Sequence, residues 1–375
     1  MTQWSDWLTA QAEARDRAGL TRRLRSRPVD DPTIDLAGND YLGLARDPAV
    51  TRAAADAALA WGAGAASSRL VTGTLDLHAE LESELAEYLG QPAALVLSTG
   101  YQANLAVVTA LADRTTHVLS DAHIHASLVD AVRLSRAQLT VVPHSDIGAV
   151  VTGLEAAAAA GERAMVLVES VYSVLGDAAP LRKLASLCLE YDALLIVDEA
   201  HGLGVHGPGL VASLELAGLP HVVVTATLSK SLGAQGGAVL GSVALREHLV
   251  NRARPFIFDT ALAPAATAGA LAALRQLIRR PELADVVRER VRELADALGV
   301  AAPAGAVLSL PMSSPDAAVA TQAAAASLGL RVGCFRPPSV PDGISRLRVT
   351  ASAGVGEEDW RRAVVTLVDL MKEHQ

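Results

Sequence analysis

Seven short apolar runs recur between residues 94 and 240, and stretches with helical periodicity separate several of them. The runs occupy residues 94–97, 117–119, 139–142, 164–168, 194–197, 222–225 and 238–240. Strands that alternate with helices build a mainly parallel sheet that is covered by helices on both faces. This alternation constrains the fold more than any other feature of the chain, and it predicts an α/β protein.

The pattern changes after about residue 280, where a charged helix at 281–298 leads into shorter elements. These elements form a smaller α+β set at residues 306–310, 322–328, 330–335, 346–350 and 357–371. A chain of 375 residues is long for a single hydrophobic core, which favours two domains. We therefore predict an N-terminal segment (1–38), a large domain (39–280) and a small C-terminal domain (281–375).

The composition excludes several classes of function. A formal net charge of −9 argues against general nucleic-acid binding. No apolar run reaches the ~18 residues that would span a membrane, and the N-terminus lacks the pattern of a signal peptide. The two cysteines, Cys188 and Cys334, fit neither a disulfide framework nor a metal cluster, which indicates a reducing compartment. We therefore expect a cytoplasmic protein.

Two of the predicted strands end in side chains of complementary chemistry. Strand 222–225 runs into a small polar turn that carries Lys230, and strand 194–197 ends in Asp198, with His201 three residues further on. The carboxyl ends of parallel strands meet at one edge of a sheet, where ligands bind. A lysine holds pyridoxal 5′-phosphate (PLP) as a Schiff base, and a carboxylate keeps its pyridine nitrogen protonated. These residues therefore predict a PLP site.

A phosphate cradle is predicted where strand 94–97 turns into a helix. The N–H groups of Thr99, Gly100 and Tyr101 would lie at the helix N-terminus, which favours anions. Such turns are common, and the signal is weak by itself. Beside Lys230, the cradle becomes the natural site for the cofactor phosphate, and hydroxyls from Thr227 and Ser229 would add donors.

Two histidines, His123 and His125, follow strand 117–119 and lie close to Asp121. They invite interpretation as metal ligands, but no third histidine or cysteine lies at a matching spacing, and we expect no metal. Two alternatives remain open for these side chains. Each histidine is either an ordinary loop residue with satisfied hydrogen bonds or a flat partner that stacks on the pyridine ring.

Several segments together resemble the α-oxoamine synthase family of PLP enzymes. They are residues 39–44 (NDYLGL), 68–73 (SRLVTG), 98–104 (STGYQAN), 125–127 (HAS), 169–173 (ESVYS), 198–202 (DEAHG), 227–230 (TLSK) and 336–341 (RPPSVP). They follow the family order and cover nearly the whole chain. Two of these segments favour the biotin-pathway branch of the family. One is the His-Gly pair that follows DEA, and the other is RPPSVP. Both weigh against the glycine-using branches and serine palmitoyltransferase.

The resemblance implies a fold-type I transferase like aspartate aminotransferase, and it implies roles for individual residues. Lys230 would hold PLP and move protons, Asp198 would pair with the pyridinium, and His125 would stack on the ring. The phenolic oxygen of the cofactor would meet His201 and Ser173. The remaining implied contacts are Thr99, Gly100, Tyr101, Thr227 and a second subunit's Thr260 at the phosphate, Arg336 and Asn39 at the amino-acid carboxylate, and Arg22 at the acyl substrate.

The implied reaction joins L-alanine to a pimeloyl thioester, carried by coenzyme A or by an acyl carrier protein, with loss of CO2. The active site would lie between the two subunits of a homodimer. The alternatives are an α-oxoamine synthase for glycine or serine, a PLP aminotransferase of the same fold, and a non-catalytic binding protein. One departure concerns Ser67, where the family usually has glycine; a positive φ there would strain a serine.

Overall fold

The computed structural model describes residues 2–22, 24–337 and 340–374. Its internal contacts divide the chain into two units, Met1–Thr33 and Ile34–Gln375. The first unit contains α1 (Gln3–Arg17), which begins at the Thr2 cap and buries none of its side chains. Trp4 and Trp7 lie on this helix with their rings edge to face, 5.8 Å apart.

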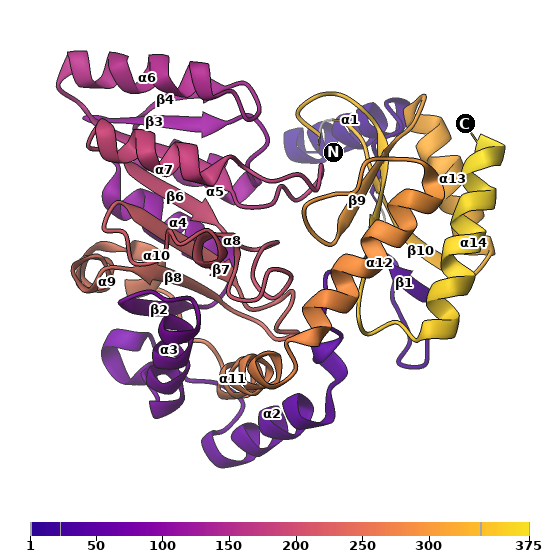
Figure 1. Cartoon of the computed structure of the whole chain (residues 1–375), viewed down its shortest axis with the longest axis horizontal. Coiled ribbons are helices and arrows are strands. Elements are labelled where there is room, and N and C mark those ends of the chain that lie inside the picture. The colour runs from indigo at the N-terminus through magenta and orange to yellow at the C-terminus, as the bar shows by residue number, and fades with distance from the viewer. Residues whose placement is uncertain (1, 23, 338–339, 375) are drawn as a thin grey trace. The chain divides into compact units, whose positions relative to one another are not determined.

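The second unit contains the predicted sheet, with strands in the order β2-β8-β7-β6-β5-β3-β4. Their bounds are β2 (Ala93–Leu97), β3 (Thr116–Asp121), β4 (Gln138–Val142), β5 (Arg163–Glu169), β6 (Leu194–Asp198), β7 (Val222–Thr227) and β8 (Gly237–Gly241). All seven apolar runs are strands, which confirms the prediction. β8 runs antiparallel to β2 and β7, whereas the other pairings in the sheet are parallel (Figure 1).

Side chains that alternate along each strand enter two separate cores. Ala94 and Val96 of β2 belong to one core, and Leu95 and Leu97 belong to the other. The first core also takes in α2 (Pro48–Trp61), α3 (Asp76–Tyr88), α6 (Ile147–Ala160), α7 (Leu181–Glu190) and α11 (Pro264–Arg279). The second takes in α4 (Gly100–Leu111), α5 (Ala126–Ser135), α9 (Val243–Arg252) and α10 (Arg254–Ile257). The sheet is therefore covered on both faces, as the alternation predicts.

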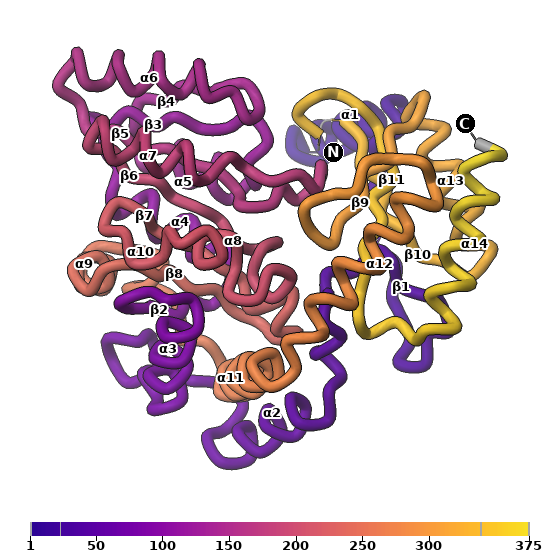
Figure 2. The backbone as a smooth tube through the Cα atoms, in the orientation of Figure 1, coloured from indigo at the N-terminus to yellow at the C-terminus, as the bar shows by residue number. Residues whose placement is uncertain are grey.

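A second, four-stranded sheet has the order β1-β10-β11-β9. It comprises β1 (Ile34–Leu36), β9 (Val307–Pro311), β10 (Leu330–Phe335) and β11 (Arg346–Thr350), beside α12 (Glu282–Leu298), α13 (Pro315–Ser327) and α14 (Glu357–His374) (Figure 1). The path of the chain passes from α11 through α12 into this sheet (Figure 2). β1 comes from the predicted N-terminal segment yet pairs in parallel with β10. The division at residues 38 and 280 stays a prediction.

One helix differs from its predicted extent. The predicted element at 322–328 belongs to α13, which already begins at Pro315. The Ser314 hydroxyl caps this helix by accepting the N–H of Ala317 at 3.0 Å. Because α13 is rich in alanine, its apolar periodicity is weak, and the cap is the better sequence signal for its start.

Candidate active site

The carboxyl ends of β2, β3, β5, β6 and β7 lie at one edge of the large sheet, because these strands run in the same direction. Most of the predicted site residues follow these strand ends. They are Thr99, Gly100 and Tyr101 after β2, His125 after β3, Ser173 after β5, Asp198 and His201 at β6, and Thr227 and Lys230 at β7. This is the edge where open parallel sheets bind their ligands.

Lys230 is the centre of this arrangement. Its Nζ lies 2.6 Å from Nε2 of His201, and Nδ1 of His201 lies 2.6 Å from the hydroxyl of Tyr41. Burial lowers the pKa of Lys230 to about 8, although Asp198 and Glu169 oppose this shift. Burial also lowers the pKa of His201 well below its usual value, and the charge of Lys230 adds to the effect. The lysine is therefore neutral far more readily than a solvated one, as a nucleophilic amine must be.

Asp198 is fixed by donors on both carboxylate oxygens. Asn104 Nδ2 donates to Oδ2 at 2.7 Å, and the N–H of Ala200 donates to Oδ1 at 2.9 Å. Asn104 is itself held by the Thr225 hydroxyl, which donates to its Oδ1 at 2.6 Å. These hydrogen bonds fix the orientation of a buried carboxyl group. Asn104 lies within a family motif, but the sequence assigned it no role.

His125 is the N-cap of α5 and is exposed at this edge of the sheet. Its Nδ1 lies 2.7 Å from Oγ of Ser127, which also accepts from Asn104 Nδ2 at 2.9 Å. Desolvation lowers the pKa of His125, Asp198 opposes the shift and Lys230 adds to it. The Tyr101 ring lies edge-on, 6.3 Å from the imidazole. A neutral, oriented imidazole fits the predicted stacking partner, which stays a prediction.

The N-terminus of α4 provides the predicted anion cradle. Thr99 caps the helix by accepting the N–H of Gln102 at 3.1 Å, and the first N–H groups of any helix lack intrahelical acceptors. A Cβ on Gly100 would lie 2.9 Å from Cβ of Thr227, so the end of β7 closely approaches this helix. The Thr227 hydroxyl lies 2.7 Å from that of Ser229. Backbone donors and hydroxyls thus meet in one place, and the residues fit a phosphate group.

A second polar chain links the two sheets through Arg348, which the sequence did not single out. Arg348 is buried on β11, and its Nε donates to the carbonyl of Ser173 at 2.7 Å. Its Nη2 donates to Oδ1 of Asn39 at 3.0 Å, which also accepts from the Tyr41 hydroxyl at 3.2 Å. Asn39 and Ser173 therefore both belong to the network around His201. Sequence alternation offers one signal, since Arg346, Arg348 and Thr350 share a face of β11.

The remaining predicted residues are placed less directly. Arg336 directly follows β10 and is half-buried, whereas Arg22 is exposed in the first unit. Thr260 is exposed and forms an antiparallel bridge with Ser68. The strain anticipated at Ser67 falls one residue earlier, because Ala66 has the positive φ of 60° in this loop. Pro338 and Ser339 of the matched 336–341 motif lie outside the described residues.

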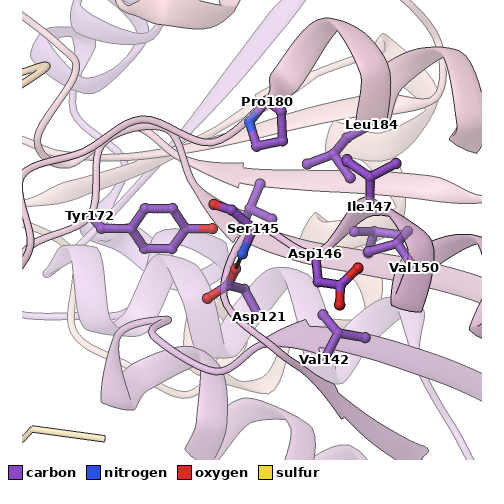
Figure 3. A pocket seen from close by; sticks show the side chains of 11 residues that line it. Asp121, Val142, Ser145, Asp146, Ile147, Val150, Tyr172, Pro180 and Leu184 are labelled. Atoms are coloured by element: carbon purple, nitrogen blue, oxygen red, sulfur yellow. Dashed lines mark hydrogen bonds between the residues drawn. The ribbon is translucent and has the colours of Figure 1, made fainter. Parts of the chain in front are cut away.

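Asp121 and His123 belong to a separate cluster beside the site. His144 Nδ1 lies 2.9 Å from Asp121 Oδ1, and its Nε2 lies 2.8 Å from Asp177 Oδ2. The Tyr172 ring points toward Asp121 across a small, mostly apolar cavity (Figure 3). Among the described residues, no group of three or more His, Cys, Asp and Glu side chains is arranged to hold a metal ion.

Known proteins resemble this chain over nearly its whole length. A family model described as aminotransferase class I and II matches residues 31–367. The 8-amino-7-oxononanoate synthase of Mycobacterium marinum is 51% identical over 368 residues, covering 97% of this chain and 94% of that protein. The enzyme of the same name from Mycolicibacterium smegmatis is 50% identical over 369 residues, covering 97% and 96%.

Solved structures share the whole fold. A structure described as SPT with PLP has a TM-score of 0.89 at 28% identity and covers 100% of this chain and 99% of that one. Serine palmitoyltransferase from Sphingomonas wittichii has a TM-score of 0.88 at 29% identity, covering 99% and 98%. The 8-amino-7-oxononanoate synthase from Francisella tularensis has a TM-score of 0.78 at 26% identity, covering 92% and 99%.

The fold and the lysine site define a fold-type I transferase that depends on PLP. The chain belongs to the class I and II aminotransferase family and, within it, to the 8-amino-7-oxononanoate synthases. It is thus an acyltransferase rather than an aminotransferase or a binding protein. None of the described helices is long and apolar enough to cross a membrane.

Proposed function

We propose that this enzyme condenses L-alanine with a pimeloyl thioester and releases CO2 to give 8-amino-7-oxononanoate, in the cytoplasm. The observation that carries the proposal is the position of Lys230, with its Nζ 2.6 Å from His201 Nε2, at the sheet edge that also holds Asp198. The names of the curated relatives support the product. L-alanine and pimelate fit that product, because its carbon skeleton is that of pimelate joined to the Cα and methyl carbons that alanine keeps after its carboxylate leaves as CO2.

Bound PLP supplies an electron sink for the negative charge that develops on the amino-acid Cα. Lys230 would bind the cofactor, and its low-pKa amine would hold or return the Cα proton. Asp198, whose carboxylate oxygens are held by Asn104 and the Ala200 N–H, would pair with the ring nitrogen. His201 and Ser173 would hold the phenolic oxygen of the ring.

The substrate contacts follow from charge and shape. We assign Arg336 to the alanine carboxylate, because a guanidinium binds a carboxylate through two parallel hydrogen bonds. Asn39 adds a polar contact and is held in place by Arg348 at 3.0 Å. We assign Arg22 to the distal carboxylate or thioester of the acyl substrate. His125 would stack on one face of the cofactor ring, which would leave the other face for the thioester.

We also propose a homodimer with the active site at its interface. Large apolar side chains are exposed in two segments that the bridge between Ser68 and Thr260 joins. These side chains are Leu59, Trp61, Leu70, Val71 and Phe258, with 45–86% of their surface exposed. A second copy of the chain would cover them and bring its Thr260 hydroxyl to the phosphate cradle.

The decisive experiment is absorbance spectroscopy of the PLP-loaded protein and of Lys230→Ala. We expect a visible band only with Lys230, a shift of this band with L-alanine, and thioester-dependent CO2 release. Pimeloyl-CoA and pimeloyl carrier protein are compared as donors, and glycine and L-serine as acceptors. Efficient turnover of L-serine with palmitoyl-CoA would assign the chain to another branch. Amino transfer to a keto acid without thioester would make it an aminotransferase.

The dimer is tested by sedimentation velocity on Val71→Asp, beside Val365→Asp on α14 as a matched control. Val71 is 73% exposed and Val365 is 62% exposed, so neither variant loses much packing in the monomer. We expect the first variant to dissociate, because a charge is expensive in an apolar interface. The second should remain dimeric. Dissociation of both variants, or of neither, contradicts this interface.

A further inference from the structure

Glu169 is a buried acid that the reaction as described leaves without a role. It ends β5, and its backbone pairs directly with that of Asp198 at the end of β6. Glu169 is 2% exposed and Asp198 is 5% exposed. Residues paired in this way on neighbouring strands point their side chains to the same face of the sheet. Two carboxyl groups therefore end adjacent strands in the interior, beside the cofactor lysine.

The two carboxyl groups have different partners. Asp198 receives hydrogen bonds from Asn104 and from the N–H of Ala200, one on each oxygen. Glu169 Oε2 accepts a hydrogen bond from the N–H of Ser173 at 2.9 Å. Its Oε1 is buried and has no hydrogen-bond partner in the described structure. Since neighbouring buried carboxylates cannot both ionise cheaply, the proton belongs on the one with fewer donors.

We propose that Glu169 is a positioning residue that holds the Ser173 turn as a neutral carboxylic acid, so that β5 adds no second negative charge beside Asp198. Two hydrogen bonds hold the turn at Ser173. Arg348 donates to the Ser173 carbonyl at 2.7 Å, and Glu169 accepts the Ser173 N–H. An ionised Glu169 would compete with Asp198 for the positive charge of the bound cofactor. A neutral Glu169 fixes the turn without competing with Asp198 for that positive charge.

The charged surroundings support this state. Burial and then the charge of Asp198 raise the pKa of Glu169 to about 8, against the opposing effect of Lys230. Tyr41 and Tyr172 also interact electrostatically with the Glu169 carboxyl group. Burial raises the pKa of both phenols, so neither carries a charge near neutral pH. Glu169 should therefore carry its proton at pH 7 and lose it as the pH rises through about 8.

The test uses the PLP-loaded enzyme with 13C-labelled glutamate and compares wild type with Glu169→Gln and Glu169→Ala. Glutamine keeps the neutral charge and the acceptor for the Ser173 N–H, whereas alanine removes the acceptor. Infrared difference spectra at pH 7 should show a carboxylic-acid carbonyl band that disappears above pH 8. The band should be absent from both variants. Glu190→Gln, an exposed change on α7, serves as the control that leaves the band unaltered.

A second buried glutamate requires its own comparison. Burial also raises the pKa of Glu199, whose two oxygens accept from Ser170 Oγ and the Val211 N–H, each at 2.6 Å. A band that persists in Glu199→Gln therefore belongs to Glu169, even if the Glu169 variants fail to fold. Absence of this band from Glu199→Gln at pH 7 overturns the proposal.

The visible absorbance of the Lys230-bound cofactor gives an independent readout. With a neutral Glu169, its pH titration in Glu169→Gln should match wild type below pH 7 to within about 0.3 unit. If Glu169 were ionised, the apparent pKa of the Lys230-bound cofactor would fall by about one unit or more in Glu169→Gln, because glutamine removes a buried negative charge. The inference rests on the proposed function. A missing visible band in wild type would refute that function, whereas the infrared result alone decides the state of Glu169.

Discussion

Nζ of Lys230 and Nε2 of His201 lie 2.6 Å apart in the interior, and the pKa of each is lowered by burial. Two basic groups at this distance cannot both carry a proton without strong repulsion. Because the pKa of His201 falls well below its usual value while the pKa of Lys230 falls only to about 8, the imidazole is the neutral partner and its Nε2 accepts the hydrogen bond from Nζ. Tyr41 completes the chain from the other side of the ring, at 2.6 Å from Nδ1.

The series of contacts from Tyr41 through His201 to Lys230 predicts the effect of Tyr41→Phe. The change leaves Nδ1 of His201 buried without its partner, which costs about 1–3 kcal/mol of stability. We expect a lower melting temperature and roughly a tenfold lower kcat, with cofactor still bound. Thermal unfolding and steady-state kinetics measure both. Tyr191→Phe, whose exposed hydroxyl lies 3.5 Å from Glu155, is the control. Wild-type kcat in Tyr41→Phe would show that His201 needs no support.

Asn104 offers a sharper comparison, because it bonds Thr225, Ser127 and Asp198 at once. Asn104→Ala removes these bonds and should cost about 1–3 kcal/mol. Asn104→Asp has almost the same shape but places a carboxyl against Oδ2 of Asp198, so we expect a loss of about 3–5 kcal/mol. Urea unfolding and PLP affinity should rank wild type above alanine and alanine above aspartate. Equal losses of stability in Asn104→Ala and Asn104→Asp would show that charge beside Asp198 is unimportant.

Much of this site follows from local sequence patterns. Apolar runs predicted the strands, and the residues after their ends, such as Asp198 and Lys230, had to meet at one edge of a parallel sheet. Asn104 was missed because a polar side chain near the start of a helix usually faces solvent, whereas this one is 3% exposed. Arg348 was missed because a charged side chain on a strand usually faces solvent, whereas this one is 4% exposed.

Long-range pairing explains the other differences. β1 has only three residues, and its partner β10 lies almost at the other end of the chain. A three-residue apolar segment gives no periodicity that could reveal such a pairing. The assignment of Asn39 depends on it, because Asn39 follows β1 closely and meets Arg348 of the same sheet. Such contacts depend on tertiary structure rather than on local preference.

His144 predicts how stability depends on pH. Hydrogen bonds to Asp121 and then Asp177 raise the pKa of His144 to about 9, against the opposing effect of burial. A pKa raised in the folded state gives stability that is full below about pH 6.5 and is lost as the pH rises through about 9. Asp177 is half-exposed, so we discount the contribution to about 1–2 kcal/mol.

The measurement is the free energy of unfolding between pH 6 and pH 9.5, for wild type and His144→Gln. The wild type should lose more stability across this range, and the two curves should converge at high pH. The neighbouring imidazole of His123, 4.7 Å away, is retained in both proteins. His248→Gln, at an exposed histidine that bonds a backbone carbonyl, should follow wild type. Parallel curves for wild type and His144→Gln would refute the ion pair.

The phosphate cradle depends on two segments that approach closely without side chains between them. A Cβ on Gly237 would lie 2.3 Å from the carbonyl oxygen of Thr99, which is backbone and cannot rotate away. Gly237→Ala should therefore push β8 from the N-terminus of α4 and cost about 1–3 kcal/mol. A Cβ on Gly241, in the same strand, would crowd the flexible end of Leu245 at 2.8 Å and meet its other neighbours at an ordinary 4.0 Å. PLP affinity should fall in the first variant and stay near wild type in Gly241→Ala. If both variants bind PLP equally well, the cradle does not depend on this approach, and the phosphate must be held elsewhere at the edge of the sheet.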